Sequence, residues 1–123
     1  MAGSLYTNHL PDFLTEIELL PLSQVRRIKP VRNGLRLALS YSDYVLGEEF
    51  VISDVWPDFL DESGASMPKT SDLEGRYKVE MHIVFPEMRR VHFETLSDHP
   101  EFLCTEGTDI VGRGRYIKWL GNL

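Results

Sequence analysis

Apolar and polar residues alternate with a period of two along much of this chain, and no other feature constrains its fold as strongly. The pattern is clearest over residues 76–85, where Tyr77, Val79, Met81 and Ile83 share one face. Successive side chains of a β-strand point to opposite faces, so the pattern predicts a half-buried strand. His82 falls on the polar face of this strand, and a proline ends it.

We expect further strands at residues 13–20, 35–41, 48–52, 91–96, 101–104 and 109–120. The Asn33-Gly34 pair favours a tight turn between the first two. Gly112 and Gly114 share one face of the last strand, where they permit a sharp bend or a close backbone approach. We find no strong amphipathic helix. Six or seven strands joined by turns predict an all-β fold, either a small closed barrel or a sandwich.

A length of 123 residues fits one domain. We expect a flexible leader over residues 1–12 and a single β domain over residues 13–123. Residues 53–75 hold six carboxylates against Lys69 alone, together with prolines, glycines and serines, which predicts a long acidic loop. Trp56, Phe59 and Leu60 do not suit a solvated loop, and we expect them to cover an open edge or end of the barrel, for example as one helical turn.

The formal net charge of −6 disfavours a general affinity for nucleic acid or for an anionic membrane. Residues 24–36 nevertheless form a basic segment without any acid, and its charged members are Arg26, Arg27, Lys29, Arg32 and Arg36. Two interpretations stay open. In the first, this segment binds RNA phosphate or an acidic protein. In the second, it neutralises the acidic loop within the same molecule. We expect one acidic and one basic region on the surface.

The chain begins without an apolar signal region and contains no run of the roughly 18 apolar residues that a membrane helix needs. Cys104 is the only cysteine, so no internal disulfide can form. A lone thiol without an export signal predicts a cytoplasmic protein.

Candidate catalytic and metal-binding residues are few. The four histidines, His9, His82, His92 and His99, show no metal-ligand spacing, and we expect them at the surface. A nucleophilic Cys104–His99 pair is one alternative, but Cys104 follows two apolar residues and a buried, inert thiol is expected instead. The carboxylates of residues 53–75 are expected to form a solvated face. The chain has no GxxxxGK[ST] motif, so we expect no nucleotide, metal or other cofactor.

Two blocks of the sequence are similar to the third domain of elongation factor Tu. In residues 18–41, Arg27, Pro30, Gly34 and Arg36 fall at the spacing of that family. In residues 102–120, an acid-glycine turn is followed by a valine-glycine-small-glycine strand, and the matching residues are Glu106, Gly107, Val111, Gly112 and Gly114. Departures lie at Val25-Arg26, Leu35, Ala38 and Thr108-Asp109.

The resemblance implies a closed six-stranded antiparallel β-barrel that carries no nucleotide and no catalytic group. In the family, this barrel packs on neighbouring domains and offers a surface to the T-stem of aminoacyl-tRNA and to an exchange factor. Carried over by position, Arg27, Glu106 and Gly107 would lie where the family contacts the T-stem. The segment Gly112-Arg113-Gly114-Arg115 also resembles RGG-type RNA-binding sequences, but between Val111 and Tyr116 it fits strand geometry better.

The sequence therefore favours a non-catalytic module that binds a macromolecule, most simply a protein, through Arg26, Arg27, Lys29, Arg32, Arg36, Glu106 and Gly107. A bacterial immunity or antitoxin-type partner is one version, and a translation-associated partner is another. The first alternative is an RNA-binding module that contacts a tRNA-like stem. The second is a small hydrolase or transferase, which would require polar groups to converge in a pocket.

Overall fold

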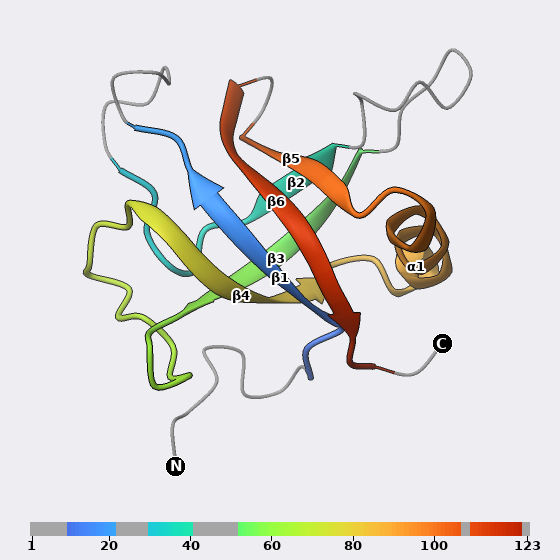
Figure 1. Ribbon diagram of the computed structural model, residues 1–123, viewed down its shortest axis with the longest axis horizontal. Helices are drawn as coiled ribbons and strands as arrows, with labels where there is room; N and C mark the ends of the chain where they lie inside the picture. The colour runs from blue at the N-terminus through green and yellow to red at the C-terminus, as the bar shows by residue number, and fades with distance from the viewer. Residues whose placement is uncertain (1–9, 22–29, 41–51, 107–108, 122–123) are drawn as a thin grey trace.

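The computed structural model describes residues 10–21, 30–40, 52–106 and 109–121, and in them the chain forms a closed β-barrel (Figure 1). The strands are β1 (Phe13–Leu19), β2 (Leu37–Ser40), β3 (Ile52–Leu60), β4 (Gly75–Ile83), β5 (Glu101–Glu106) and β6 (Asp109–Trp119). They pair in the order β1-β4-β3-β2-β5-β6, and every pair is antiparallel. The predicted small, closed, six-stranded all-β barrel is confirmed.

Alternate residues of each strand fill the barrel. In β1, Phe13, Thr15, Ile17 and Leu19 are buried, and Thr15 Oγ1 donates a hydrogen bond to the Val79 carbonyl at 3.2 Å. The other five strands contribute buried apolar residues to the same core, and these include Leu37, Leu39, Val55, Phe59, Val79, Met81, Ile83, Phe102, Cys104 and Val111. Burial of this set is the main favourable contribution to folding, as in other small domains.

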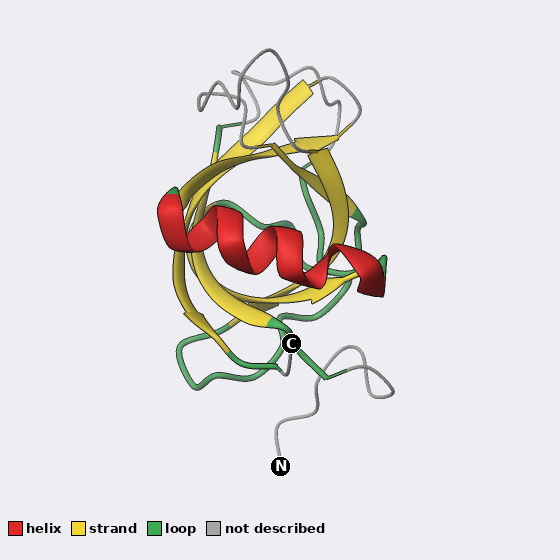
Figure 2. Cartoon of the chain, turned by 90° about the vertical axis from the view of Figure 1, so that its right-hand side faces the viewer, coloured by secondary structure: helices red, strands yellow, loops and turns green. Residues whose placement is uncertain are grey.

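A helix closes one end of the barrel, where we predicted a strand over residues 91–96. After a 3-10 turn at Pro86–Met88, α1 (Arg89–Asp98) lies across the barrel opening (Figure 2). His92 and Leu96 are buried on its inner face, four residues apart as helical periodicity requires. Phe93 packs edge-on against Trp119, with ring centroids 5.3 Å apart. The strand prediction was wrong because Val91 and Phe93 suit a strand locally, whereas the barrel end supplies an apolar surface that only a helix covers here.

Strand β3 is a second correction, since we placed residues 53–60 in an acidic loop. Val55, Pro57 and Phe59 are buried, whereas Asp54 and Trp56 on the opposite face are partly exposed. Pro57 does not break the strand, because β2 pairs with β3 only as far as Val55. The nitrogen of Pro57 lies on the β2 side of β3, beyond the end of β2. The N–H that proline lacks would therefore have had no β2 carbonyl to bond. Trp56, Phe59 and Leu60 belong to this strand and not to a helical turn, and the connection to β4 begins at Asp61. Of the strand expected at residues 48–52, only Ile52 lies within the described part of the chain.

Asp12 fixes the start of the barrel, although we placed it in the leader. Its side chain is 2% exposed, and Oδ2 accepts a hydrogen bond from the Ile83 N–H at 2.7 Å. Arg89 Nε lies 2.9 Å from Asp12 Oδ1, and the Leu120 N–H donates to the Asp12 carbonyl at 2.9 Å. One residue thus joins the ends of β4 and β6 to the first turn of α1. Residues 1–9 lie outside the described part of the chain.

A charged groove on the outer wall of the barrel

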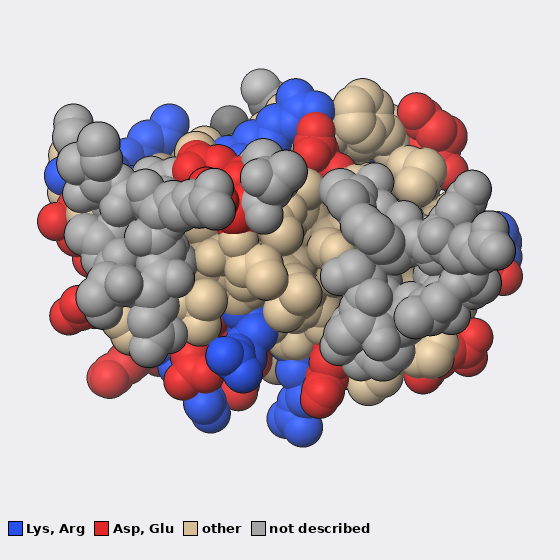
Figure 3. Space-filling model, turned by 90° about the horizontal axis from the view of Figure 1, so that it is seen from above, with Lys and Arg blue, Asp and Glu red and all other residues tan. Residues whose placement is uncertain are grey.

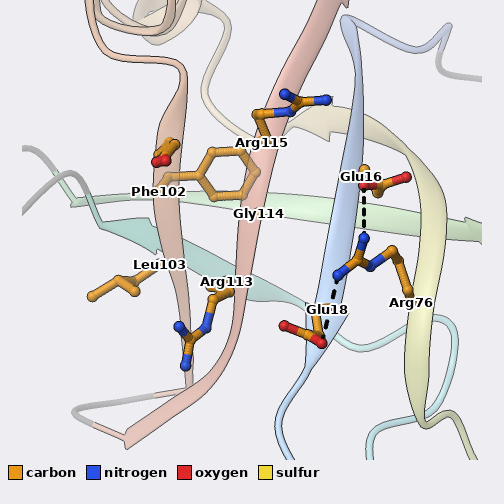
Figure 4. Close-up of a pocket in the computed structure, with 9 residues that line it drawn as sticks. Glu16, Glu18, Arg76, Phe102, Leu103, Arg113, Gly114 and Arg115 are labelled. Atoms are coloured by element: carbon orange, nitrogen blue, oxygen red, sulfur yellow. Dashed lines mark ion pairs between the residues drawn. The ribbon is translucent and has the colours of Figure 1, made fainter.

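A groove of about 520 Å³ runs over the outer surface of β5, β6, β1 and β4 (Figure 4). It is lined by Glu16, Glu18, Arg76, Glu101, Phe102, Leu103, Arg113, Gly114 and Arg115. Its volume lies within the range usual for ligand sites. The lining side chains are mostly charged, so the groove suits a polar or charged partner.

Strand register places opposite charges next to one another across this wall. One row of neighbouring positions runs Glu101, Arg115, Glu16 and Lys78. The next row runs Leu103, Arg113, Glu18 and Arg76. Opposite charges at facing positions stabilise a sheet modestly, whereas like charges there destabilise it. Acidic and basic side chains are likewise interspersed on the face that Figure 3 shows, among the residues it describes.

The two β1 carboxylates in the groove are held by one guanidinium. Arg76 lies 3.7 Å from Glu16 through Nη1 and 3.7 Å from Glu18 through Nη2. The Arg76 side chain is 62% exposed, so each of these ion pairs contributes little to stability. Their consequence is local: the single positive charge of Arg76 offsets part of the negative charge of Glu16 and Glu18 from the β4 side.

Arg113 and Arg115 are the cationic side chains of the groove that remain available. Both side chains are exposed, and neither side chain forms an ion pair or hydrogen bond within residues 10–21, 30–40, 52–106 and 109–121. They lie two residues apart on β6, so they share its outer face. Figure 4 shows their side chains pointing in opposite directions along the wall, with Gly114 between them.

Gly114 lets an aromatic ring pack directly beneath this part of the groove. A Cβ atom at Gly114 would lie 2.4 Å from Phe102 Cζ and 3.2 Å from the Glu16 carbonyl oxygen. At Gly112, a Cβ atom would lie 2.9 Å from the Glu18 carbonyl oxygen. The predicted close backbone approach at both glycines is therefore confirmed, and at Gly114 it is required by the buried ring of Phe102.

The predicted basic segment is partly engaged within the molecule. Arg32 Nε lies 2.9 Å from Asp72 Oδ1, and Arg36 Nε donates to Asp54 Oδ2 at 2.9 Å. The Arg36 guanidinium also lies 5.5 Å from the centre of the Phe85 ring. These two arginines therefore form internal ion pairs of the kind that neutralisation of the acidic residues requires, and they do not form a basic region apart from the acidic one.

The other predicted contact residues are spread over the chain. Arg26, Arg27, Lys29 and Gly107 lie outside the described residues, and Glu106 is the partly buried last residue of β5. Neither Arg32, Arg36 nor Glu106 lines the groove. The sequence carried one signal for the groove, because Arg113 and Arg115 are two residues apart in a predicted strand and so share one face. That spacing does not indicate which strands lie beside β6.

The turn residues behave as expected, and Asn33 does more than turn the chain. Gly34 has φ +95°, a conformation that glycine adopts without strain. Asn33 is 4% exposed, and its side-chain Nδ2 donates to Asp58 Oδ1, the Phe59 carbonyl and the Met67 carbonyl. Ser66 Oγ donates to the other oxygen of Asp58 at 2.7 Å. Glu80 lies opposite Asp58, on β4. Desolvation is the larger cause that raises the pKa of Glu80, and the negative charge of Asp58 is the smaller one.

The thiol of Cys104 and the imidazoles of His82 and His92 are buried and do not line the groove. Cys104 is fully buried, as predicted, and burial raises the pKa of its thiol to about 12. His82 and His92 are also fully buried, so the prediction of surface histidines was wrong for both. Burial lowers the pKa of His92 to about 4. In the described part of the chain, no three acidic, histidine or cysteine side chains converge as a metal site would require.

None of the helices among the described residues combines the length and the apolar character required to span a membrane. Comparisons of the chain with protein-family models, with curated proteins and with solved structures found no match.

Proposed function

We propose that this chain is a non-catalytic protein-binding module and that the groove over β5, β6, β1 and β4 is its contact surface. The observation that supports this most directly is the position of Arg113 and Arg115. Their two exposed guanidinium groups lie on one face of β6, within the groove, and no described carboxylate forms an ion pair with them. Arginine is among the residues most enriched at protein interfaces.

The groove favours a protein partner over RNA. Its lining includes the carboxylates of Glu16, Glu18 and Glu101, and Arg76 can offset only one of these charges, so the groove would repel a phosphate backbone that carries a negative charge at every nucleotide. The net charge of −6 acts against RNA in the same direction. A protein surface can present both signs of charge, and complementarity of that kind sets partner choice and association rate.

Two further expectations remain part of this proposal. The resemblance to the third domain of elongation factor Tu, which acts by contact with other macromolecules, is compatible with the closed six-stranded antiparallel barrel. A cytoplasmic location is supported by the lone buried thiol of Cys104.

Site-specific photo-crosslinking tests the proposed function. A photoreactive amino acid replaces Leu103, which lines the groove, and the protein is irradiated in a lysate of the source cells. We expect discrete protein adducts that weaken when Arg113→Gln and Arg115→Gln are combined with the crosslinker. The matched control carries the crosslinker at Glu87, an exposed residue that does not line the groove.

The proposal fails if the Leu103 position yields no adduct, or if the Glu87 position yields the same ones. Adducts that disappear after nuclease treatment would instead favour the RNA-binding alternative.

A further inference from the structure

We infer that the groove recognises an extended protein segment in which two acidic residues are separated by one residue. This inference rests on the proposed protein-binding function and adds the chemistry of the partner. It depends on the spacing and direction of the two unengaged arginines, on the carboxylates beside them, and on the closed form of the barrel.

The spacing of the arginines sets the spacing of the acids. Arg113 and Arg115 are two residues apart on an extended strand, so their Cα atoms are separated by about 6.6–6.8 Å. A partner segment in extended conformation repeats its side chains at the same interval. Acidic residues at positions i and i+2 of that segment would therefore come opposite the Cα positions of Arg113 and Arg115, from which the two guanidinium groups diverge (Figure 4).

The direction of the two side chains argues against one small anion. Arg113 and Arg115 point away from each other, with Gly114 between them (Figure 4). A single phosphate or sulfate would reach one guanidinium and leave the other unpaired. Two carboxylates on separate side chains match two diverging cations better, because each can approach one guanidinium as a bidentate pair.

The remaining charges of the wall favour a partner of limited negative charge. Glu101 is exposed at the position opposite Arg115, and its side chain forms no ion pair or hydrogen bond with described residues. Arg76 lies 3.7 Å from both Glu16 and Glu18 and can offset one of their two negative charges, so these carboxylates compete only in part for Arg113 and Arg115. A segment with two acids fits this surface, whereas a long acidic tract would bring further carboxylates against Glu101.

The closed barrel determines how such a segment binds. Within the described residues every strand has a paired neighbour on both sides, so along its paired stretches the sheet offers no open edge for strand addition. The partner must lie over the outer face and make side-chain contacts. Affinity of a single short segment will then be low and strongly dependent on ionic strength.

Fluorescence polarisation with three labelled peptides tests this inference at low ionic strength. The peptides share a Gly/Ser/Val context and differ in a central Glu-Ala-Glu, Glu-Ala-Ala-Glu or Gln-Ala-Gln. We expect the first to bind most tightly. We expect Arg113→Gln and Arg115→Gln each to weaken its binding by roughly two- to fivefold, and the double variant by about tenfold. Arg90→Gln is the matched control, because Arg90 is an exposed arginine outside the groove.

Several results would overturn the inference. These are equal binding of the two glutamate peptides, no binding of any peptide, an effect of Arg90→Gln as large as that of Arg113→Gln, or full displacement of the Glu-Ala-Glu peptide by millimolar phosphate. Circular dichroism of each variant must match the parent protein. If groove-dependent protein adducts form at Leu103 while the peptides bind equally, the partner chemistry is wrong but the proposed function stands. If neither adducts at Leu103 nor binding of any peptide is observed, both fail.

Discussion

The side-chain amide of Asn33 pairs with both backbone groups of Phe59. Asn33 Oδ1 accepts a hydrogen bond from the Phe59 N–H at 2.9 Å, and Nδ2 donates to the Phe59 carbonyl at 3.2 Å. These groups face the side of β3 on which β2 has already ended. The amide therefore takes the place of a neighbouring strand, and it satisfies backbone groups whose burial without partners would be costly.

Replacing this amide by a carboxylate should destabilise the barrel. In Asn33→Asp, an oxygen would replace Nδ2 and face Asp58 Oδ1 and the carbonyls of Phe59 and Met67. We expect a loss of roughly 3 kcal/mol at pH 7, since the variant buries an uncompensated charge. Urea unfolding, monitored by circular dichroism, measures this loss in the free energy of unfolding.

A compensating substitution provides the control for Asn33→Asp. In the double variant Asn33→Asp/Asp58→Asn, the new amide can donate to the new carboxylate, and we expect part of the lost stability to return. Stability of Asn33→Asp equal to that of the parent at pH 7 would show that the amide does not act as described.

Gly114 and Phe102 should behave as a coupled pair. A Cβ atom at Gly114 would lie 2.4 Å from Phe102 Cζ, and a buried ring cannot move aside freely. We expect Gly114→Ala to cost about 1–3 kcal/mol in the free energy of unfolding. In the background of Phe102→Leu, which shortens the side chain over this position, the same substitution should cost less. A double-mutant cycle from urea unfolding gives the coupling energy, and a coupling of zero would contradict the packing described.

Protonation of His92 should destabilise the fold in mild acid. Burial lowers the pKa of His92 to about 4, below the ordinary value of 6.5. Between these two values the unfolded chain binds a proton that the folded chain does not. The unfolding free energy therefore falls as the pH falls through this window, by up to about 1.4 kcal/mol per pH unit from this group.

Comparison of two helix variants isolates that contribution. Unfolding free energies measured at steps between pH 7 and pH 4 should fall less steeply in His92→Leu than in the parent protein. Ser97→Ala, at an exposed position of the same helix, changes no titratable group and should keep the parent slope. An unchanged slope in His92→Leu would assign the acid sensitivity to other groups.

The thiol of Cys104 should be unreactive in the folded protein. It is fully buried, and burial raises its pKa to about 12, so almost no thiolate is present at neutral pH. We expect alkylation by iodoacetamide to be slow without denaturant and to become fast in urea above the unfolding midpoint. The control is Cys104→Ala/Ser97→Cys, whose thiol stands on an exposed helix position and should react at once. Rapid alkylation of folded parent protein would contradict this burial.

Local pattern predicted those parts of the fold that depend on neighbouring residues. The alternation over residues 76–85 corresponds to β4, and the Asn33-Gly34 pair does form a turn. The same alternation was present over residues 53–60 but was missed, because Pro57 and the acids suggested a loop. Residues 91–96 suit a strand by composition, yet they form part of α1 because the open end of the barrel requires a cover.

The strands of this chain alternate between a buried and an exposed face, and the residue pattern predicts this because side-chain direction along an extended backbone is a local property. The position of β1 between β4 and β6, in contrast, follows from the fold of the whole chain. That order places Lys78, Glu16 and Arg115 side by side, although they come from distant parts of the chain. Contacts between strands depend on how the whole sheet closes, and no local pattern specifies this closure.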